Sequence, residues 1–131
     1  MVPKFRAWDK GLEFMMPVES IDFEYGMINV NAAWRTFEEI ELMQSTGYKD
    51  KNGVEIFEGD LVKVSVDNGF DYLFEELSIV KPSKFHSGLV CSLKSHEAEY
   101  RIIHAEILGY EYEVVGNFYK NPELLEQADE N

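Results

Sequence analysis

Cysteine is almost absent from this chain of 131 residues, because Cys91 is its single copy. No disulfide can form within the chain, which excludes the class of small secreted proteins that depend on several disulfides. Long apolar runs are also missing, and the longest stretches fall far below the roughly 18–20 residues of a membrane helix. No apolar run follows the basic residues Lys4 and Arg6, so we expect no signal peptide. These absences predict a soluble, cytoplasmic protein.

Basic side chains are few, and this shortage limits the partners of the protein. The chain has 12 Lys and Arg against 25 Asp and Glu, which gives a formal net charge of −13. Phosphate backbones and anionic lipids are both bound by clustered Lys and Arg. We therefore expect no direct nucleic-acid binding and no membrane docking. A single basic patch, residues 81–86 with two lysines, Phe85 and His86, is interpreted as a solvated loop.

The chain nevertheless has enough apolar residues for a core. Hydrophobic residues make up 45% and aromatic residues 14%, which argues against a disordered chain in spite of the charge. The four prolines are spread out, and no repeat, low-complexity tract or linker interrupts the pattern. Because the length fits the usual ~100–200 residues of a domain, we predict a single domain over residues 1–131.

Alternating apolar and polar residues predict strands through most of the sequence. Between residues 60 and 66 three valines alternate with polar side chains, as a half-buried strand requires. Between residues 110 and 114 two tyrosines and a valine alternate with two glutamates in the same way. Residues 101–108 carry apolar side chains on both faces, which fits a strand covered on both sides or a helix. Further candidate strands are 4–8, 26–30, 89–93 and the stretch in which Phe70, Tyr72 and Phe74 alternate with Asp71 and Glu75.

Turn signals separate these stretches at intervals of about ten residues, which is typical of a small all-β barrel or sandwich. Asn52-Gly53 is the preferred pair for a two-residue hairpin of type I′, in which both residues need positive φ. Asn68-Gly69, Gly109 and Gly116-Asn117 mark other strand ends. We predict a mainly β (β-rich α+β) fold, a small, partly open SH3-like barrel with short flanking helices.

Two regions are predicted to contain helical residues. Residues 121–127 combine Asn121 as N-cap, Pro122 at the first helical position and an acidic first turn, which predicts a short C-terminal helix. The region 32–41 fits both a helical face and a strand alternation. We interpret it as a helix that leads into a strand.

No constellation of catalytic or metal-binding residues stands out. The three histidines, His86, His96 and His104, and Cys91 lie at spacings that match no compact zinc site. Cys91 lies in an apolar run without a neighbouring cation, which is typical of an inert buried cysteine. Paired carboxylates are numerous, but a solvated face explains them in a chain with 25 acidic residues. Glycine-rich phosphate loops are missing, so we predict no catalytic or metal residues and no cofactor.

Three segments, residues 4–9, 42–62 and 112–125, together resemble the YopX family of small phage and prophage proteins. They read KFRAWD, LMQSTGYKDKNGVEIFEGDLV and YEVVGNFYKNPELL. Departures are mild: Ser45 stands where the family commonly has an aromatic residue, and residues 71–99 follow no family pattern. The resemblance implies a phage or prophage origin and a life in the host cytoplasm, but it carries over no activity and no catalytic residues. The family-motif residues are Trp8, Asp9, Gly47, Asp50, Asn52, Gly53, Gly59, Asp60, Gly116, Asn117 and Pro122.

Most of these motif residues have an architectural explanation. Residues 52–53 supply a hairpin turn, residues 59–60 form a corner before the valine strand, and residues 116–122 release the last strand into the helix. Trp8 and Asp9 are less obviously architectural, since an indole beside a charge can anchor a partner. We favour burial of Trp8 against the barrel.

We predict a non-catalytic accessory protein that works as a protein-binding or assembly module. Its aromatic residues exceed the needs of one small barrel, which suggests a homo-oligomer. The alternative is an acidic inhibitor or DNA mimic that occupies the basic groove of a host enzyme that binds nucleic acid. A third hypothesis, an enzyme, requires a pocket with converging polar groups, and the sequence supplies no constellation for one.

Overall fold

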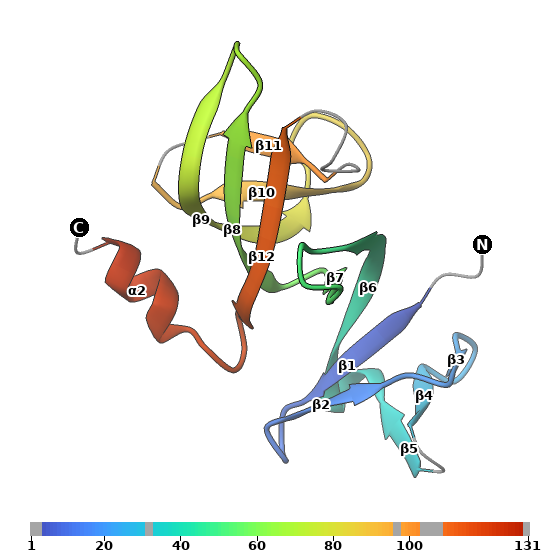
Figure 1. Cartoon of the computed structure of the whole chain (residues 1–131). Coiled ribbons are helices and arrows are strands. Elements are labelled where there is room, and N and C mark those ends of the chain that lie inside the picture. The colour runs from blue at the N-terminus through green and yellow to red at the C-terminus, as the bar shows by residue number, and fades with distance from the viewer. Residues whose placement is uncertain (1–3, 31–32, 96–97, 103–108, 130–131) are drawn as a thin grey trace. The chain divides into compact units, whose positions relative to one another are not determined.

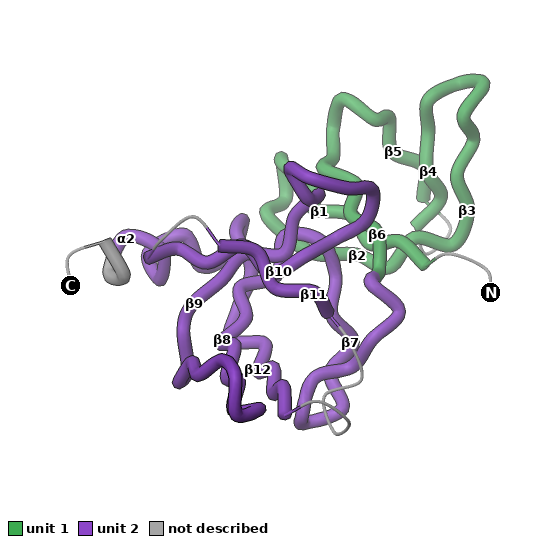
Figure 2. The backbone as a smooth tube through the Cα atoms, turned by 90° about the horizontal axis from the view of Figure 1, so that it is seen from above, with its two compact units in different colours: residues 1–45 green, residues 46–131 purple. Residues whose placement is uncertain are grey.

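The computed structural model describes residues 4–30, 33–95, 98–102 and 109–129 (Figure 1). Strands account for 60% of the residues and helices for 6%, so the prediction of a mainly β fold is confirmed. The chain forms two compact units, residues 1–45 and residues 46–131, which Figure 2 shows in different colours. The division into two compact units does not test the prediction of a single domain over residues 1–131, which stays a prediction. None of the described helices is long and apolar enough to span a membrane.

Unit 1 is built from short antiparallel strands. β1 pairs with β2 on one side and with β6 on the other, while β3, β4 and β5 form a separate three-stranded sheet. Side chains from both sheets form the buried core, namely Ala7, Met16, Ile28, Val30 and Ile40. The strands are β1 (Phe5–Asp9), β2 (Phe14–Pro17), β3 (Ser20–Asp22), β4 (Met27–Val30), β5 (Ala33–Thr36) and β6 (Ile40–Lys49), whose last residues belong to unit 2.

The region 32–41 differs from its prediction as a helix that leads into a strand. Residues 33–36 form the strand β5, and a single 3₁₀ turn, η1 (Phe37–Glu39), precedes β6. Pairing with β4 places Ala33 opposite the buried Val30, so the sheet decides the conformation where the sequence pattern was ambiguous. The turn starts at Thr36, whose N–H and hydroxyl both donate to Glu39 Oε1, at 2.9 and 3.0 Å. The strand part of the prediction is confirmed, whereas the predicted helix is limited to the 3₁₀ turn at residues 37–39.

Unit 2 contains one antiparallel sheet of five strands in the order β11-β10-β9-β8-β12, which is strongly curled in Figure 1. Its buried cluster is led by the three valines Val62, Val64 and Val66 together with Tyr112, as their alternation predicted. Beside the sheet lie a short strand paired with β6 and a C-terminal helix. The elements are β7 (Glu55–Phe57), β8 (Asp60–Asp67), β9 (Tyr72–Pro82), β10 (Leu89–Leu93), β11 (Glu99–Arg101), β12 (Tyr110–Asn117) and α2 (Glu123–Asp129).

The two edges of this sheet approach each other, which makes it a partly open barrel. The hydroxyl of Tyr112 on β12 donates to the carbonyl of Arg101 on β11 at 2.7 Å. The rings of Tyr100 and Tyr110, one on each edge strand, meet edge to face with centroids 6.4 Å apart. Hydrogen bonds to β12 from residues 50–51 cover part of its free edge. Tyrosine side chains therefore connect strands that the backbone ladder leaves apart, and the predicted architecture is confirmed.

Several element boundaries differ from the sequence predictions. β9 begins at Tyr72, so Phe70 lies in the loop before the strand rather than in it. The predicted C-terminal helix is present as α2, which starts one residue after the predicted first helical position Pro122 and ends two residues later than predicted. In the stretch 101–108, β11 ends at Arg101, and residues 103–108 lie outside the described residues.

The hairpin at Asn52-Gly53 also differs from its predicted type I′ turn. Gly53 has a φ of 82°, but Asn52 is not among the residues with positive φ. The N–H of Gly53 donates to Asp50 O at 3.0 Å and the N–H of Asp50 donates to Val54 O at 2.8 Å. This is a three-residue loop, a type I turn followed by a left-handed glycine. The side chain of Asp50, which accepts the N–H groups of Asn52 and Val54, stabilises this longer loop.

Candidate interaction surface

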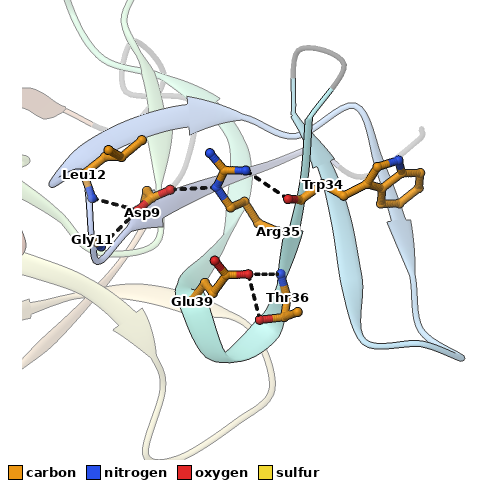
Figure 3. A network of polar contacts seen from close by, with 7 residues as sticks. All are labelled: Asp9, Gly11, Leu12, Trp34, Arg35, Thr36 and Glu39. Atoms are coloured by element: carbon orange, nitrogen blue, oxygen red, sulfur yellow. Dashed lines mark hydrogen bonds and ion pairs between the residues drawn. The ribbon is translucent and has the colours of Figure 1, made fainter.

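In unit 1, the motif residue Asp9 joins three segments of the chain, as Figure 3 shows. Its Oδ1 accepts the backbone N–H groups of Gly11 and Leu12 at 2.9 and 2.8 Å, and its Oδ2 accepts Arg35 Nε at 3.0 Å. The N–H of Leu12 is the leading cause that holds the pKa of the Asp9 carboxyl below its usual value, followed by the Arg35 hydrogen bond. The Asp9 side chain thus links the turn between β1 and β2 to Arg35 of β5. Its neighbour Trp8, for which we favoured burial against the barrel, is buried, and it lies on β1 of unit 1.

In unit 2, the motif residue Asp50 connects its own loop to β12. Asp50 Oδ1 accepts the N–H groups of Asn52 and Val54 at 2.9 and 2.8 Å, and Asp50 Oδ2 accepts the N–H of Val114 at 2.9 Å. Asp50 itself is buried, while Asn52 and Val54 are exposed residues of the loop, so a single side chain links this loop to β12. The side chain therefore closes one side of the barrel.

A second set of motif residues lies where β8 starts and β12 ends. Gly59 donates its N–H to Val80 O, and its carbonyl accepts the N–H of Phe118, both at 2.8 Å. The buried carboxylate of Asp60 accepts the N–H of Phe57 at 2.8 Å. Asn117 Oδ1 accepts the N–H groups of Tyr119 and Lys120 in the following turn, at 3.0 and 2.7 Å. These bonds hold the corner and the exit of the last strand.

The remaining motif residues lie at backbone bends of the same units. Gly47 is within β6, Gly116 is at the β-bulge between β12 and β8, and the carbonyl of Pro122 accepts the N–H of Leu125 at 3.1 Å. The carboxylates of Asp9, Asp50 and Asp60 all accept backbone N–H groups of this chain, and Asp9 also accepts Arg35 Nε. The structure distributes the motif over turns rather than gathering it into one site.

The histidines and the cysteine that were considered as metal ligands or as a nucleophile do not form a site among the described residues. Within the described ranges, no group of three or more His, Cys, Asp and Glu side chains is arranged to hold a metal ion. His86 is exposed and its Nδ1 lies 2.7 Å from the carbonyl of Ser87, while His96 and His104 lie outside the described residues. Cys91 is buried in the core of unit 2, and this burial raises the pKa of its thiol to about 12.

We therefore expect Cys91 to react very slowly with iodoacetamide. A pKa raised from 9.0 to about 12 lowers the thiolate fraction about a thousandfold at a given pH, and the thiolate is the nucleophile. At pH 8 the folded protein should be alkylated at least ~100-fold more slowly than the chain unfolded in urea. A rate equal to that of the unfolded chain would contradict the buried position.

The basic patch at residues 81–86 is partly neutralised by an acidic neighbour. Glu99 Oε1 accepts the hydroxyl of Ser83 at 2.7 Å, and Glu99 Oε2 accepts the N–H of Lys84 at 2.9 Å. These two bonds, the Ser83 hydroxyl first, hold the pKa of the Glu99 carboxyl below its usual value. A carboxylate that orders the loop makes it a poor site for phosphate.

Aromatic side chains are exposed in both units, and they are densest on the hairpin that joins β8 to β9. Phe70 is 100% exposed, Tyr72 69% and Phe74 67%. These three side chains, which we call the aromatic hairpin face, lie within five consecutive residues. Elsewhere the exposed aromatic residues are Phe14, Phe23, Tyr25, Trp34, Phe37, Phe85 and Phe118.

The backbone of this hairpin is held by hydrogen bonds on both sides. Asn68 Oδ1 accepts the N–H groups of Phe70 and Asp71 at 3.0 and 2.8 Å, which closes the loop. At the base of the loop, the N–H of Asp67 donates to Gly109 O at 3.0 Å. The loop stands out from one end of the curled sheet in Figure 1. The exposed aromatic side chains therefore project from a preorganised loop.

A β-bulge sets which side chains face outward. Register with β8 pairs Leu73 with the buried Val66, and Leu73 packs against the core, so Tyr72 points to the outer face. The register shifts between Val64 and Val66. At this point Glu75 has a φ of 48° and its N–H donates to Ser65 Oγ at 3.0 Å. An extra residue in β9 thus turns Phe74 away from the core.

Carboxylates surround the aromatic hairpin face. Between Ser65 and Ser78 the chain has four acidic residues and no basic one. Asp71 is held in place, because its Oδ2 accepts the hydroxyl of Tyr100 at 2.8 Å. Burial of Tyr100, together with this hydrogen bond, raises its pKa to about 12, so the hydroxyl keeps the proton that it donates. The surface combines apolar rings with negative charge.

The sequence pattern singled out these aromatic residues as a strand but not as a surface. The signal was present in the alternation of Phe70, Tyr72 and Phe74 with acidic residues. A strand normally turns one such face to the core, and the sequence did not reveal the bulge that places Leu73 there instead. A run of aromatic residues interleaved with acidic ones at a turn would have been the useful signal.

The chain is similar to a known family and to a solved structure. A model of the YopX family, described as YopX protein, matches residues 4–126 of the chain. The crystal structure of protein EF1440 from Enterococcus faecalis is similar, with a TM-score of 0.64 and 27% sequence identity, over 95% of this chain and 99% of that one. No curated protein matches the chain. The similarity therefore extends over both units.

Proposed function

We propose that this chain, which belongs to the YopX family, is a phage or prophage accessory protein that acts in the host cytoplasm by binding a protein. It catalyses no reaction in this proposal, and the aromatic hairpin face is its recognition surface. The single observation that supports the proposal is the exposure of Phe70, Tyr72 and Phe74 on a loop whose backbone is held by hydrogen bonds.

Three neighbouring aromatic side chains that are exposed to solvent do not contribute hydrophobic burial to the stability of the isolated protein. Tyr and Phe are enriched at the centres of protein interfaces, where each contributes a large contact area. Full burial of such a side chain is worth roughly 1.5–3 kcal/mol. Because the loop is already ordered, little of this binding free energy would be lost in fixing the conformation of the loop. The hairpin is therefore suited to anchor a partner.

Site-specific cross-linking tests the proposal in the cells that carry the gene. We expect p-benzoylphenylalanine at position 70 to yield a discrete cross-linked protein on irradiation. The fully exposed Phe70 side chain can accept this larger ring without disturbing the core. The matched control places the same residue at position 85, which is also highly exposed but lies in another loop.

The outcome depends on the position of the cross-link. A discrete product from position 70 that weakens with Tyr72→Ser and Phe74→Ser supports the proposal. Products that are equal at positions 70 and 85, or no product at either, would refute it. A product at twice the mass of the 15.2 kDa chain would assign the hairpin to homo-oligomeric assembly.

A second candidate function is inhibition of a host enzyme that binds nucleic acid, through mimicry of its substrate. The observation that favours it is the acidity of the outer face, where Glu111 of β12 and Asp67 of β8 are both exposed. The two candidates differ in the partner. Under this candidate the cross-linked protein is a nuclease or a polymerase, and added DNA abolishes the product by competition.

A further inference from the structure

We infer that the aromatic hairpin face docks an arginine-rich, basic segment of a partner protein. The inference rests on the proposed function, because it names the chemistry of the partner that the hairpin would bind. It is carried by two features of one surface, namely exposed aromatic rings and a local excess of carboxylates.

The charged residues of the hairpin itself are all acidic. Asp67 and Glu75 are exposed, and each flanks the aromatic rings on the paired strands β8 and β9. Glu111 faces outward from β12 opposite Ser65, although Lys51 Nζ lies 3.6 Å from its carboxylate. No Lys or Arg occurs between Ser65 and Ser78. A partner with positive charge meets complementary potential here, which also speeds association.

The aromatic rings favour arginine over lysine in that partner. A guanidinium stacks on an aromatic face and donates two parallel hydrogen bonds to a carboxylate, whereas an ammonium acts as a compact, strongly hydrated charge. Tyr72 is close in sequence to Glu75 and is paired with Asp67 across the ladder. An arginine over the ring of Tyr72 therefore finds carboxylates on the same hairpin.

The same charge argues against other occupants of this face. A second copy of the chain would bring two sets of carboxylates together, which is repulsive in a chain with a net charge of −13. Nucleic acid and anionic lipid carry the same sign as the hairpin. A basic protein segment is the occupant for which both the rings and the charges are favourable.

Binding of labelled nona-arginine and nona-lysine peptides to the full chain, measured by fluorescence anisotropy, tests the inference. We expect the arginine peptide to bind roughly tenfold more tightly than the lysine peptide of equal charge. The triple variant F70S/Y72S/F74S should lose most of this preference. The control variant F14S/Y25S/F85S removes three other exposed aromatic residues and should keep it.

A second pair of variants separates local charge from total charge. D67N/E75Q removes two carboxylates beside the rings, and E24Q/E123Q removes two exposed carboxylates elsewhere, so both variants have the same net charge. We expect D67N/E75Q to lower the affinity for the arginine peptide roughly five- to tenfold, and E24Q/E123Q to lower it less than twofold. Equal effects of the two variants would overturn the inference, as would equal binding of the two peptides or no binding.

Failure of this inference is distinguishable from failure of the proposed function. If position 70 cross-links a partner but the arginine peptide shows no dependence on the hairpin, the binding module stands and the basic partner is wrong. A cross-linked dimer of this chain would likewise overturn the basic partner. If position 70 yields no product, the proposed function itself is wrong.

Discussion

Replacement of Gly109 by alanine is expected to destabilise the protein by about 2–5 kcal/mol. Gly109 has a φ of +74°, and a Cβ there would clash with the carbonyl oxygen of Asp67. The left-handed conformation costs an alanine about 1–2 kcal/mol, and overpacking costs about 1–3 kcal/mol more. Backbone atoms cannot move aside as a flexible side chain can. Urea unfolding of the variant beside the parent protein gives the change in free energy.

Gly69→Ala is the matched control for this prediction. Gly69 has a φ of +85° and nothing within 4 Å of an added Cβ, so it carries only the conformational cost of about 1–2 kcal/mol. The difference between the two variants isolates the contact between Gly109 and the end of β8. Equal losses at the two positions would show that β12 does not approach Asp67 as described.

Asp50→Ala is expected to cost about 3–5 kcal/mol of the free energy of unfolding. The carboxylate accepts three backbone N–H groups, from Asn52, Val54 and Val114. Hydrogen bonds to a charged group contribute about 1.5–3 kcal/mol each, and the buried partner left without an acceptor is penalised further. Water can replace the acceptor at the exposed loop, so the total stays below the full sum. Urea or thermal unfolding measures the loss.

Two variants give this prediction its controls. Asp50→Asn keeps one acceptor oxygen, so we expect about half of the loss. Asp67→Ala removes an exposed aspartate from the same unit and should change stability by less than about 0.5 kcal/mol. A loss at Asp50 no larger than that at Asp67 would refute its role as the link between the loop and β12.

The strands of unit 2 were the most predictable part of the fold. Val62, Val64 and Val66 alternate with polar residues, and β-branched side chains on one face of a strand leave little choice. The loop at Asn52-Gly53 was less predictable, because the pair also fits a type I′ turn. The side chain of Asp50 decided between the two loops, and its third partner, Val114, lies 64 residues away. A contact at that separation has no local signal.

The candidate surface shows the same division. The aromatic residues 70, 72 and 74 were visible in the sequence, but their exposure depends on a bulge at Glu75 and on the pairing of Leu73 with Val66. A shift of one residue reverses every side chain between core and solvent. Neither the bulge nor the register can be read from the alternation alone.

By itself, the sequence determined the mainly β class, the family and the negative charge of the surface, because these follow from composition, alternation and motif order. Tertiary structure alone decided which faces are buried and where the motif residues lie. Asp9, Asp50 and Asp60 look alike as acidic residues in turns. Only the folded chain shows that each accepts specific backbone N–H groups, while Asp67 and Glu75 remain exposed beside the aromatic hairpin face. The physical reason is that the burial and the hydrogen-bond partners of a carboxylate depend on residues that are distant in sequence and that only folding brings together.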